Sequence, residues 1–440
     1  MNTKYLERNI DKALAEWKKS SEHKPILLRG ARQVGKTSAV RNLGKTFENY
    51  VEIDLHLRQD LHAVFNKMKS PQQLCEELSL LEGFTFKPGK TLFFIDEIQD
   101  CPAAIGSLRY FYEQYPELHV IAAGSLLEFA LEELPSFGVG RIHSLYMYPF
   151  CFSEFLQAMD NAPLAAAVSK ASPSNPLSDV VHNKLLQFLR AFMIIGGMPA
   201  VVKKYVETNS FVECQKILAE LITAYRDDFA KYRRRIPSSR IDAVFMSVAA
   251  QTQGKFMFSK VDGVRTEQAQ AALQTLILAG LVYPVTHTAA NGIPLGAETD
   301  ERCRRMIMFD TGLLQRVLNL DLKDIILEND VNFINKGPLA EVFVGCEFVK
   351  NMPADFPAAL YCWQRDKKGS DAEIDYLVQS HNQILPVEVK SGKTGKMQSL
   401  RIFMSQKKSP FGIRTSLENF CEYQDIKVYP LYAAGNIVRG

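Results

Sequence analysis

The first third of the chain alternates short apolar runs with longer stretches of helical spacing. Nearly continuous apolar runs lie at residues 25–28, 91–95 and 119–123, and residues 51–55 form a fourth candidate strand. A continuous apolar run is typical of a strand that is buried on both faces, as in a parallel sheet. Strands that alternate with helical stretches therefore predict a parallel sheet with crossover helices.

Helical patterns precede this region and dominate the middle of the chain. An amphipathic helix is predicted near the N-terminus from apolar residues at helical spacing (Leu6, Ile10, Leu14 and Trp17). Residues 150–235 are expected to be largely helical, with a surface excursion at 161–176, where Ala, Ser, Asn and Pro are concentrated. Residues 241–284 then read as short helices and a strand, which is typical of a winged-helix or helix-turn-helix module.

Composition and charge limit the class of protein. The 440 residues are 47% hydrophobic and 23% charged, which is ordinary for a folded protein of roughly two to four domains. The net charge of +3 gives no global attraction to nucleic acid, so any basic surface must be local.

Neither a membrane-spanning nor a secreted protein is expected. The longest apolar stretch, 191–202, contains Gly196, Gly197 and Pro199 and is too short to span a bilayer. The N-terminus has no apolar signal core. The eight cysteines are scattered without a Cys-x-x-Cys pair, which indicates reduced thiols in a cytoplasmic protein and no zinc site.

One octapeptide points to a specific chemistry. Residues 30–37 read Gly-Ala-Arg-Gln-Val-Gly-Lys-Thr, a GxxxxGK[ST] sequence between an apolar run and a helix-like stretch. Its glycines let successive backbone N–H groups face phosphate oxygens, and the following helix adds its positive end. Lys36 is expected to reach the β- and γ-phosphates and Thr37 to join the Mg²⁺ shell. The predicted nucleotide-binding residues of this loop are Gly30, Ala31, Arg32, Gln33, Val34, Gly35, Lys36, Thr37 and Ser38.

Two carboxylates, Asp96 and Glu97, end the apolar run at 91–95. Ligands bind at the carboxyl ends of strands in an open α/β sheet. We expect Asp96 to hold Mg²⁺ through its waters and Glu97 to polarise the attacking water, which favours a hydrolase over a kinase. A solvated strand end is the alternative, but the preceding phosphate-binding loop favours the catalytic interpretation.

Two more residues are candidates for contact with the γ-phosphate. Ser125 follows the run at 119–123 and is expected to sense the phosphate; a helix N-cap is an equally good and compatible interpretation. Arg141 follows a glycine-containing loop and is predicted to stabilise phosphoryl charge, either within one chain or from a neighbouring subunit of a homo-oligomer. An ordinary exposed salt bridge is the alternative for Arg141.

A second chemical centre is predicted near the C-terminus, where residues 370–378 and 383–390 read as two strands of a hairpin. Side chains alternate along a strand, so Glu388 and Lys390 share one face, which Asp375 can join from the neighbouring strand. Two carboxylates and a lysine in this arrangement are typical of restriction-type nucleases, in which the carboxylates hold Mg²⁺ and the lysine orients or activates water. A charged hairpin face can produce the same pattern by accident.

The surroundings of this hairpin favour the functional interpretation. Glu341, on the preceding helix, is a candidate third metal ligand. Residues 386–414 contain seven basic residues and one acid, which suits a polyanion, and DNA is the expected partner. Residues 226–240, with six basic and two acidic residues, are a further candidate contact with DNA phosphates, for which a solvated helix end is the alternative.

Taken together, these segments resemble a family of bacterial and archaeal AAA-superfamily ATPases. In that family the C-terminal half is a conserved domain of unknown function with a PD-(D/E)XK nuclease-like module. The resemblance implies ATP binding, with hydrolysis expected from Lys36, Asp96 and Glu97. It also matches Ser125 to the sensor segment, where the wider superfamily commonly has Asn, and Arg141 to the Gly-Arg that precedes the Pro-Phe segment. The segments that carry it are 29–37, 94–99, 123–125, 140–141, 148–155, 196–199 and 386–391.

The predicted fold is of the α/β class. Its expected parts are an N-terminal helix (1–20), an AAA-type P-loop ATPase domain with a parallel sheet (21–150), a helical region (151–240), a winged-helix-like module (241–320) and a restriction-endonuclease-like α/β domain (321–440).

The leading hypothesis is an ATP hydrolase with ATP and Mg²⁺ as cofactors, coupled to a DNA-handling, nuclease-like domain. The alternative is a nucleotide-gated switch that binds DNA or protein without cutting. A small-molecule kinase is disfavoured by Glu97 and by the basic hairpin. The predicted catalytic residues are Lys36, Glu97, Arg141, Asp375, Glu388 and Lys390. The predicted metal ligands are Thr37, Asp96, Glu341, Asp375 and Glu388.

Overall fold

The computed structural model describes most of the chain. The described residues are 5–68, 70–125, 127–133, 140–230, 236–252, 254–320, 337–365, 372–380, 382–392 and 397–439. The chain forms two compact units, which we call unit 1 (Met1–Tyr148 and Pro353–Pro357) and unit 2 (Pro149–Met352 and Ala358–Gly440). Among the described helices, none has both the length and the apolar character that a membrane crossing requires.

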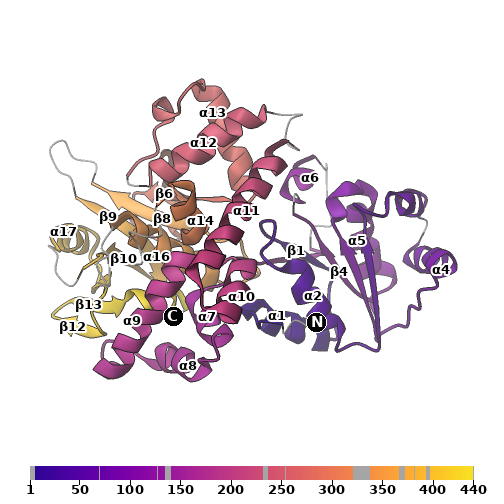
Figure 1. Ribbon diagram of the computed structural model, residues 1–440, viewed down its shortest axis with the longest axis horizontal. Coiled ribbons are helices and arrows are strands. Elements are labelled where there is room, and N and C mark those ends of the chain that lie inside the picture. Colours follow the sequence, from indigo (N-terminus) through magenta and orange to yellow (C-terminus); the bar gives the residue numbers. More distant parts are fainter. Residues whose placement is uncertain are drawn as a thin grey trace. The chain divides into compact units, whose positions relative to one another are not determined.

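Unit 1 is built on a sheet of five parallel strands in the order β2-β3-β4-β1-β5 (Figure 1). The first four strands coincide with the predicted strands to within two residues, which confirms the parallel sheet. The fifth strand has no continuous apolar run and was not predicted. The strands are β1 (Ile26–Arg29), β2 (Asn49–Asp54), β3 (Thr91–Asp96), β4 (His119–Ala123) and β5 (His143–Tyr146).

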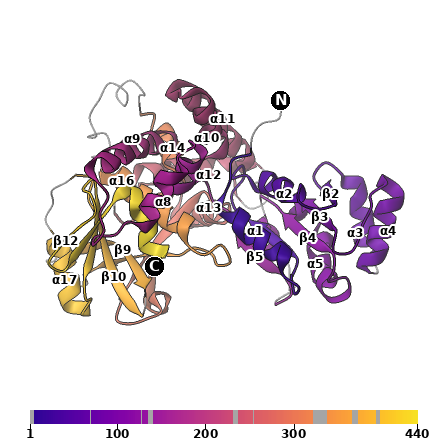
Figure 2. The ribbon, with the colours of Figure 1, turned by 90° about the horizontal axis from the view of Figure 1, so that it is seen from below.

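Helices cover both faces of this sheet, which explains the continuous apolar runs. One face packs into a buried cluster with α3 (His62–Asn66), α4 (Pro71–Glu82) and α5 (Pro102–Gln114). On the other face α2 (Lys36–Gly44) contacts β3 and β4, and α1 (Asn9–Lys19) packs on α2. Figure 2 shows α2 and α5 on opposite sides of the strands. The amphipathic pattern of the first helix is confirmed by its buried residues, Ile10, Leu14 and Trp17.

The order of the strands decides where a ligand site can form. Strand β4 lies between β1 and β3, so the carboxyl ends of these three strands meet at one edge of the sheet. The glycine-rich loop follows β1, and Ser125 follows β4. Two short elements continue from this edge, η2 (Ile98–Asp100) after β3 and α6 (Leu127–Glu133) after β4. The predicted nucleotide-binding residues are therefore brought together by the sheet.

The first part of unit 2 is helical, as predicted. One difference is that a helix, α8, occupies much of the expected surface excursion at 161–176. Its alanines favour a helix, and Pro163 lies in the first turn, where a missing N–H costs no hydrogen bond. The helices are α7 (Phe152–Ala158), α8 (Ala162–Lys170), α9 (Asp179–Ile195), α10 (Pro199–Thr208), α11 (Phe211–Phe229), α12 (Ser238–Ala250), α13 (Thr266–Leu278) and α14 (Thr311–Val317).

Two glycines join α9 to α10 beside a buried aspartate. Gly196 has φ +73°, and the Gly197 N–H donates to Asp310 Oδ2 at 2.6 Å. A Cβ atom on Gly196 would lie 2.2 Å from Asp310 Oδ1, so a larger residue does not fit without movement. Asp310 also accepts from the Leu313 N–H at 3.0 Å and thereby caps α14. Packing and backbone conformation together thus explain the glycine at position 196.

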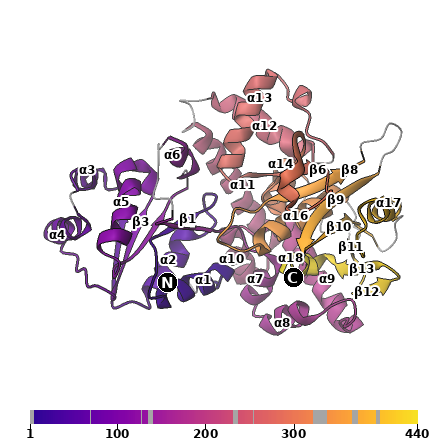
Figure 3. The same cartoon turned by 180° about the vertical axis from the view of Figure 1, so that it is seen from behind.

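A mixed sheet of eight strands forms the rest of unit 2, in the order β12-β13-β11-β10-β9-β8-β6-β7 (Figure 3). Strands β9 and β10 form the predicted hairpin. Strand β6 pairs in parallel with β8, so the β6–β7 hairpin continues the C-terminal sheet. The strands are β6 (Val282–Thr288), β7 (Thr299–Met308), β8 (Leu360–Gln364), β9 (Glu373–Ser380), β10 (Gln383–Val389), β11 (Gly412–Ser416), β12 (Cys421–Tyr423) and β13 (Ile426–Pro430).

Two helices cover opposite faces of this sheet (Figure 3). Helix α16 (Gly337–Asn351) contacts β7, β8 and β10, and α18 (Ala434–Arg439) packs on α16. Helix α17 (Gln398–Lys407) contacts β9, β10 and β11. The α/β class is confirmed, whereas the winged-helix and restriction-endonuclease-like folds stay predictions. The short 3-10 helices outside the site are η1 (Gln59–Leu61), η4 (Phe258–Lys260), η5 (Leu295–Glu298) and η7 (Leu431–Ala433).

Candidate functional site

The glycine-rich loop curls tightly between β1 and α2. Gly30, Gln33 and Gly35 have φ values of +140°, +64° and +102°. A Cβ atom on Gly30 would lie 2.1 Å from the main-chain oxygen of Met147, so no side chain fits at this position. The loop runs directly into the first residue of α2, where unpaired backbone N–H groups favour an anion.

Lys36, the first residue of α2, extends into the curl of this loop. Its Nζ donates to the main-chain oxygens of Gly30, at 2.8 Å, and Ala31, at 2.9 Å. Burial, partly offset by the charges of Glu97 and Asp96, lowers the pKa of Lys36 to about 8. The ammonium is thus already held among the backbone groups that are predicted to bind phosphate.

Thr37 and Asp96 contact each other across the sheet edge. The Thr37 hydroxyl donates to Asp96 Oδ2 at 2.7 Å, and the Glu97 N–H donates to Asp96 Oδ1 at 3.0 Å. Burial raises the pKa of Asp96 despite these hydrogen bonds. A hydroxyl and a carboxylate are oxygen ligands of the kind that Mg²⁺ prefers, so this pair fits the predicted metal role.

Glu97 is held by two neighbours. Gln99 Nε2 donates to Glu97 Oε2 at 2.6 Å, and the Ser125 hydroxyl donates to the same oxygen at 3.2 Å. Burial alone would raise the pKa of Glu97, but hydrogen bonds from Gln99 and Ser125 and the charge of Lys36 outweigh it, so the pKa is lowered. At neutral pH Glu97 is therefore an acceptor, as a water-polarising group must be.

Gln99 has a role that its sequence position did not indicate. It lies one turn past the strand, in η2, and its side chain bridges toward Gly124. A Cβ atom on Gly124 would lie 2.0 Å from Gln99 Oε1, so a larger residue there would require the amide to move. The only available signal was the Asp-Glu-Ile-Gln sequence itself, in which Gln99 is two residues from Glu97.

Arg141 does not lie at this edge of the sheet. It pairs with Glu113 near the end of α5 and precedes β5, whose first residue aligns with Ile26, the first residue of β1. The glycine-rich loop follows the opposite end of β1. Arg141 is therefore at the amino edge of a parallel sheet and cannot reach a nucleotide bound at the loop of its own chain. Its role in a neighbouring subunit stays a prediction.

In unit 2 the predicted charged residues of the hairpin do come together. Asp375 of β9 accepts from the Val389 N–H at 2.7 Å, and Lys390 Nζ pairs with Glu388 Oε1 at 2.6 Å. Glu341 of α16 approaches from the covering helix. Burial, with the charge of Asp375, raises the pKa of both Glu341 and Glu388. The sequence prediction that these residues share one site agrees with the geometry.

A residue that no sequence pattern marks lies inside this cluster. Arg305 of β7 has its Nη1 3.1 Å from Glu341 Oε2 and 3.6 Å from Asp375 Oδ1. Within the described part of the chain, no three His, Cys, Asp or Glu side chains are arranged to hold a metal ion. The carboxylates of unit 2, as arranged here, do not fit the predicted Mg²⁺ centre.

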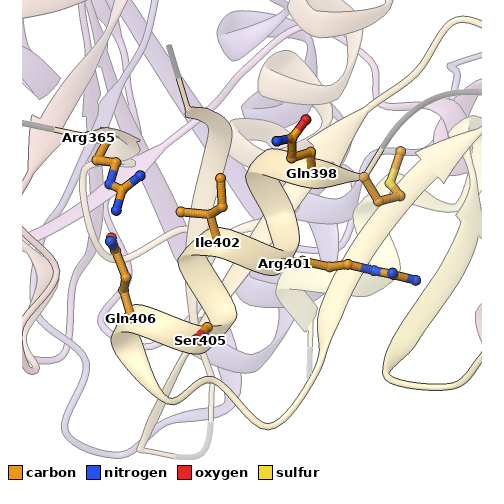
Figure 4. A pocket seen from close by; sticks show the side chains of 7 residues that line it. Arg365, Gln398, Arg401, Ile402, Ser405 and Gln406 are labelled. Atoms are coloured by element: carbon orange, nitrogen blue, oxygen red, sulfur yellow. The ribbon is translucent and has the colours of Figure 1, made fainter. Parts of the chain in front are cut away.

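A shallow hollow of about 680 Å³ lies along α17 of unit 2. Figure 4 shows Arg365 next to Gln406 on one side of it and Arg401 directed to the other. With the amide of Gln406 turned so that its oxygen faces Arg365, the guanidinium donates to that oxygen at 2.8 Å. Of the basic residues predicted to contact DNA, Lys231, Lys393, Lys396 and residues 233–235 lie outside the described residues.

Comparison with protein families separates the chain into three segments. Residues 22–156 match the family model of an AAA domain, which supports an ATPase-like P-loop fold for this part of the chain. Residues 186–324 and 336–434 match two domains of unknown function, DUF8612 and DUF4143 respectively. No curated protein matches the chain in sequence.

Several solved structures are similar to this chain at low identity. The Walker-type ATPase PABY2304 of Pyrococcus abyssi is 16% identical, with a TM-score of 0.46 over 71% of this chain and 96% of that chain. The ORC1 protein of Aeropyrum pernix in complex with DNA is 13% identical, with a TM-score of 0.29 over 72% and 92%. Drosophila ORC bound to DNA is 13% identical, with a TM-score of 0.27 over 71% and 85%. These values are too low to assign a function.

Proposed function

We propose that unit 1 binds ATP with Mg²⁺ and hydrolyses it. The observation that carries the proposal is one connected set of side chains at the carboxyl edge of the sheet. Lys36 lies inside the glycine-rich loop, Thr37 contacts Asp96, and Gln99 with Ser125 orients Glu97. The segments that follow β1, β3 and β4 at this edge therefore each supply side chains suited to ATP hydrolysis.

Each residue has a defined task in this proposal. Backbone N–H groups of residues 30–38 and the Lys36 ammonium bind the phosphates. Thr37 and Asp96 hold Mg²⁺, which when bound neutralises phosphate charge. Glu97, ionised and fixed by Gln99, accepts a hydrogen bond from water and orients it toward the γ-phosphate. The Ser125 hydroxyl, which shares the Glu97 oxygen, is placed to respond to the same phosphate.

Two substitutions separate binding from hydrolysis. Lys36→Ala should abolish binding of a fluorescent ATP analogue, because the buried ammonium is lost. Glu97→Gln should keep binding but lower the rate of phosphate release by about 100-fold or more. Glu117→Gln, an exposed change just before β4, is the matched control. Phosphate release by Glu97→Gln at the wild-type rate would contradict the proposed role.

We further propose that unit 2 binds DNA without cutting it, under the control of the nucleotide in unit 1. The hollow along α17 favours an anionic partner, because Arg365 and Arg401 lie on it with the amides of Gln398 and Gln406. Arginine and amide groups of this kind bind phosphates and bases in nucleic-acid interfaces. The position of Arg305 among the carboxylates disfavours cutting that depends on Mg²⁺.

DNA binding is tested with the variant Arg365→Ala/Arg401→Ala. Its affinity for labelled DNA, measured by fluorescence anisotropy, should fall about tenfold, and the salt dependence should weaken with each lost phosphate contact. Arg302→Ala is the control, since its side chain is 91% exposed on β7 and pairs only with Asp300 in the described structure. ATP hydrolysis should be stimulated by DNA while gel analysis shows no products. Cleavage by the wild-type protein that Asp375→Asn abolishes would support the nuclease hypothesis instead.

A further inference from the structure

Arg305 is enclosed by the residues that were expected to bind a metal ion. Its side chain is only 6% exposed. The guanidinium pairs with the carboxylates of Glu341 and Asp375 and donates to the main-chain oxygen of Asp375. Its central carbon lies 5.5 Å from the ring centroid of Tyr376, which is a cation–π distance. The Arg305 guanidinium is therefore held by two carboxylates, one main-chain oxygen and one aromatic ring.

Two more oxygens of the cluster are engaged, whereas Glu388 Oε2 is buried without a hydrogen-bond partner among the described residues. Asp375 Oδ2, the oxygen that Arg305 does not face, accepts from the Val389 N–H at 2.7 Å. Glu388 Oε1 is paired with Lys390 at 2.6 Å. A divalent cation such as Mg²⁺ or Mn²⁺ needs several oxygens that converge on one empty point. Between Glu341 and Asp375 that point is taken by a guanidinium.

Three elements hold this arrangement in place. Arg305 comes from β7, Asp375 from β9 and Glu341 from α16. The Tyr376 hydroxyl donates to the main-chain oxygen of Glu341 at 2.8 Å, so α16 is tied to β9 independently of the ion pairs. Because the surrounding positions are fixed in this way, removal of the guanidinium should leave the carboxylates facing a vacated space.

We infer that Arg305 is the resident cation of the cluster formed by Glu341, Asp375 and Glu388, and that it excludes divalent metal ions from unit 2. Charge explains the exclusion. Arg305 and Lys390 already offset most of the charge of three carboxylates, and an incoming metal ion would meet the guanidinium at close range. The inference concerns unit 2 alone and does not depend on ATP hydrolysis by unit 1.

The first test compares the wild-type chain with Asp375→Asn, both without nucleotide. Mn²⁺ binding is followed by electron paramagnetic resonance, which counts free Mn²⁺ directly. The two proteins should bind the same amount of Mn²⁺ with affinities that agree within twofold. Loss of one bound Mn²⁺ in Asp375→Asn would overturn the inference, because it would show that the cluster holds a metal beside Arg305.

The second test removes the cation with Arg305→Ala. One additional Mn²⁺ should bind at least tenfold more tightly than any Mn²⁺ in the wild type, and the double variant Arg305→Ala/Asp375→Asn should lose it again. Arg304→Ala, one residue earlier on β7 with a side chain that is 26% exposed, is the matched control and should gain nothing. A folded Arg305→Ala protein, verified by circular dichroism, that gains no Mn²⁺ would overturn the inference. If Arg305→Ala does not fold, the comparison with Asp375→Asn decides alone.

Discussion

The side-chain amide of Gln99 donates to the carboxylate of Glu97 over 2.6 Å, so the proposed water-polarising group is held by a residue two positions along the chain. This short connection crosses from the end of β3 into η2. The same amide packs against Gly124 at the tip of β4. Residues from two strands therefore fix one carboxylate, which makes its orientation sensitive to changes that do not touch it.

Gly124→Ala should disturb Glu97 through Gln99. The new methyl group would lie 2.0 Å from Gln99 Oε1, and the flexible amide would have to turn away from Glu97. We expect kcat for ATP hydrolysis to fall by up to about 100-fold, as misplacement of a reacting group commonly causes. The affinity for nucleotide, measured by titration, should change less than twofold.

Gly106→Ala is the matched control for this prediction. Gly106 lies in α5, and a Cβ atom there meets nothing within 4 Å. Its substitution should leave kcat unchanged and should stabilise the protein by about 0.5–1 kcal/mol, because alanine favours a helix interior over glycine. A Gly124→Ala protein with wild-type kcat would show that Gln99 does not position Glu97.

The affinity for ATP should fall as the pH rises through 8. Burial lowers the pKa of Lys36 to about 8 in the free protein, and triphosphate oxygens beside the ammonium should raise that pKa in the complex. Above pH 8 Lys36 is neutral in the free protein, so ATP binding must be accompanied by uptake of a proton. Below pH 8 Lys36 is already protonated, so ATP binds without proton uptake. The linkage predicts a loss of up to about tenfold in affinity per pH unit above 8.

Calorimetry in two buffers of different ionisation enthalpy measures this proton uptake directly. Uptake should be near zero at pH 7 and should approach one proton per ATP at pH 9. Equal affinity at the two pH values, together with no uptake at either, would rule out the coupling to Lys36.

Arg141→Ala should lower ATP hydrolysis only if neighbouring subunits share sites. Arg141 lies at the amino edge of its own sheet, paired with Glu113. An arginine supplied by another subunit is commonly worth about 10³-fold in kcat. Mixing Arg141→Ala with Lys36→Ala should then restore part of the activity, since the second protein offers an intact Arg141 to the nucleotide site of the first. Glu113→Gln, which frees Arg141 without removing it, serves as the control.

No recovery on mixing, with each variant tested over a range of protein concentrations, would refute a shared site. Wild-type hydrolysis by Arg141→Ala alone would do the same and would leave Arg141 as a surface ion pair.

Gly196→Ala should destabilise unit 2. The added Cβ would lie 2.2 Å from Asp310 Oδ1 at a positive φ, and Asp310 must keep its hydrogen bond to Gly197 and its cap on α14. We expect a loss of about 2–4 kcal/mol in the free energy of unfolding, measured in urea. Gly254→Ala has a similar positive φ but open space around the Cβ, so it should lose only about 1 kcal/mol. Equal losses in the two variants would show that Asp310 is not the cause.

The features that could be predicted from the sequence are those determined by residues that lie close together in the chain. The glycine-rich loop is contiguous, so its residues identify the site before any fold is known. Continuous apolar runs mark β1, β3 and β4 because both faces of the sheet are covered. Asp375 and Glu388 lie on adjoining strands of a hairpin, which fixes their spacing from the sequence alone.

What could not be predicted depends on the order of strands and on contacts between distant segments. The position of Arg141 is decided by the direction of β5, which has too few apolar residues to be recognised. Arg305 meets Glu341 and Asp375 only because β7 and β9 belong to one sheet, and nothing near Arg305 in the chain indicates that pairing.

The parallel pairing of β6 with β8 has a consequence for where this chain can be divided into fragments. Residue Val285 aligns with Leu360 across a boundary at which one matched family segment ends, at 324, and the next begins, at 336. Expressing either segment alone would expose a strand edge with unsatisfied backbone groups, a surface that promotes self-association. Truncation at that boundary should therefore yield fragments that self-associate.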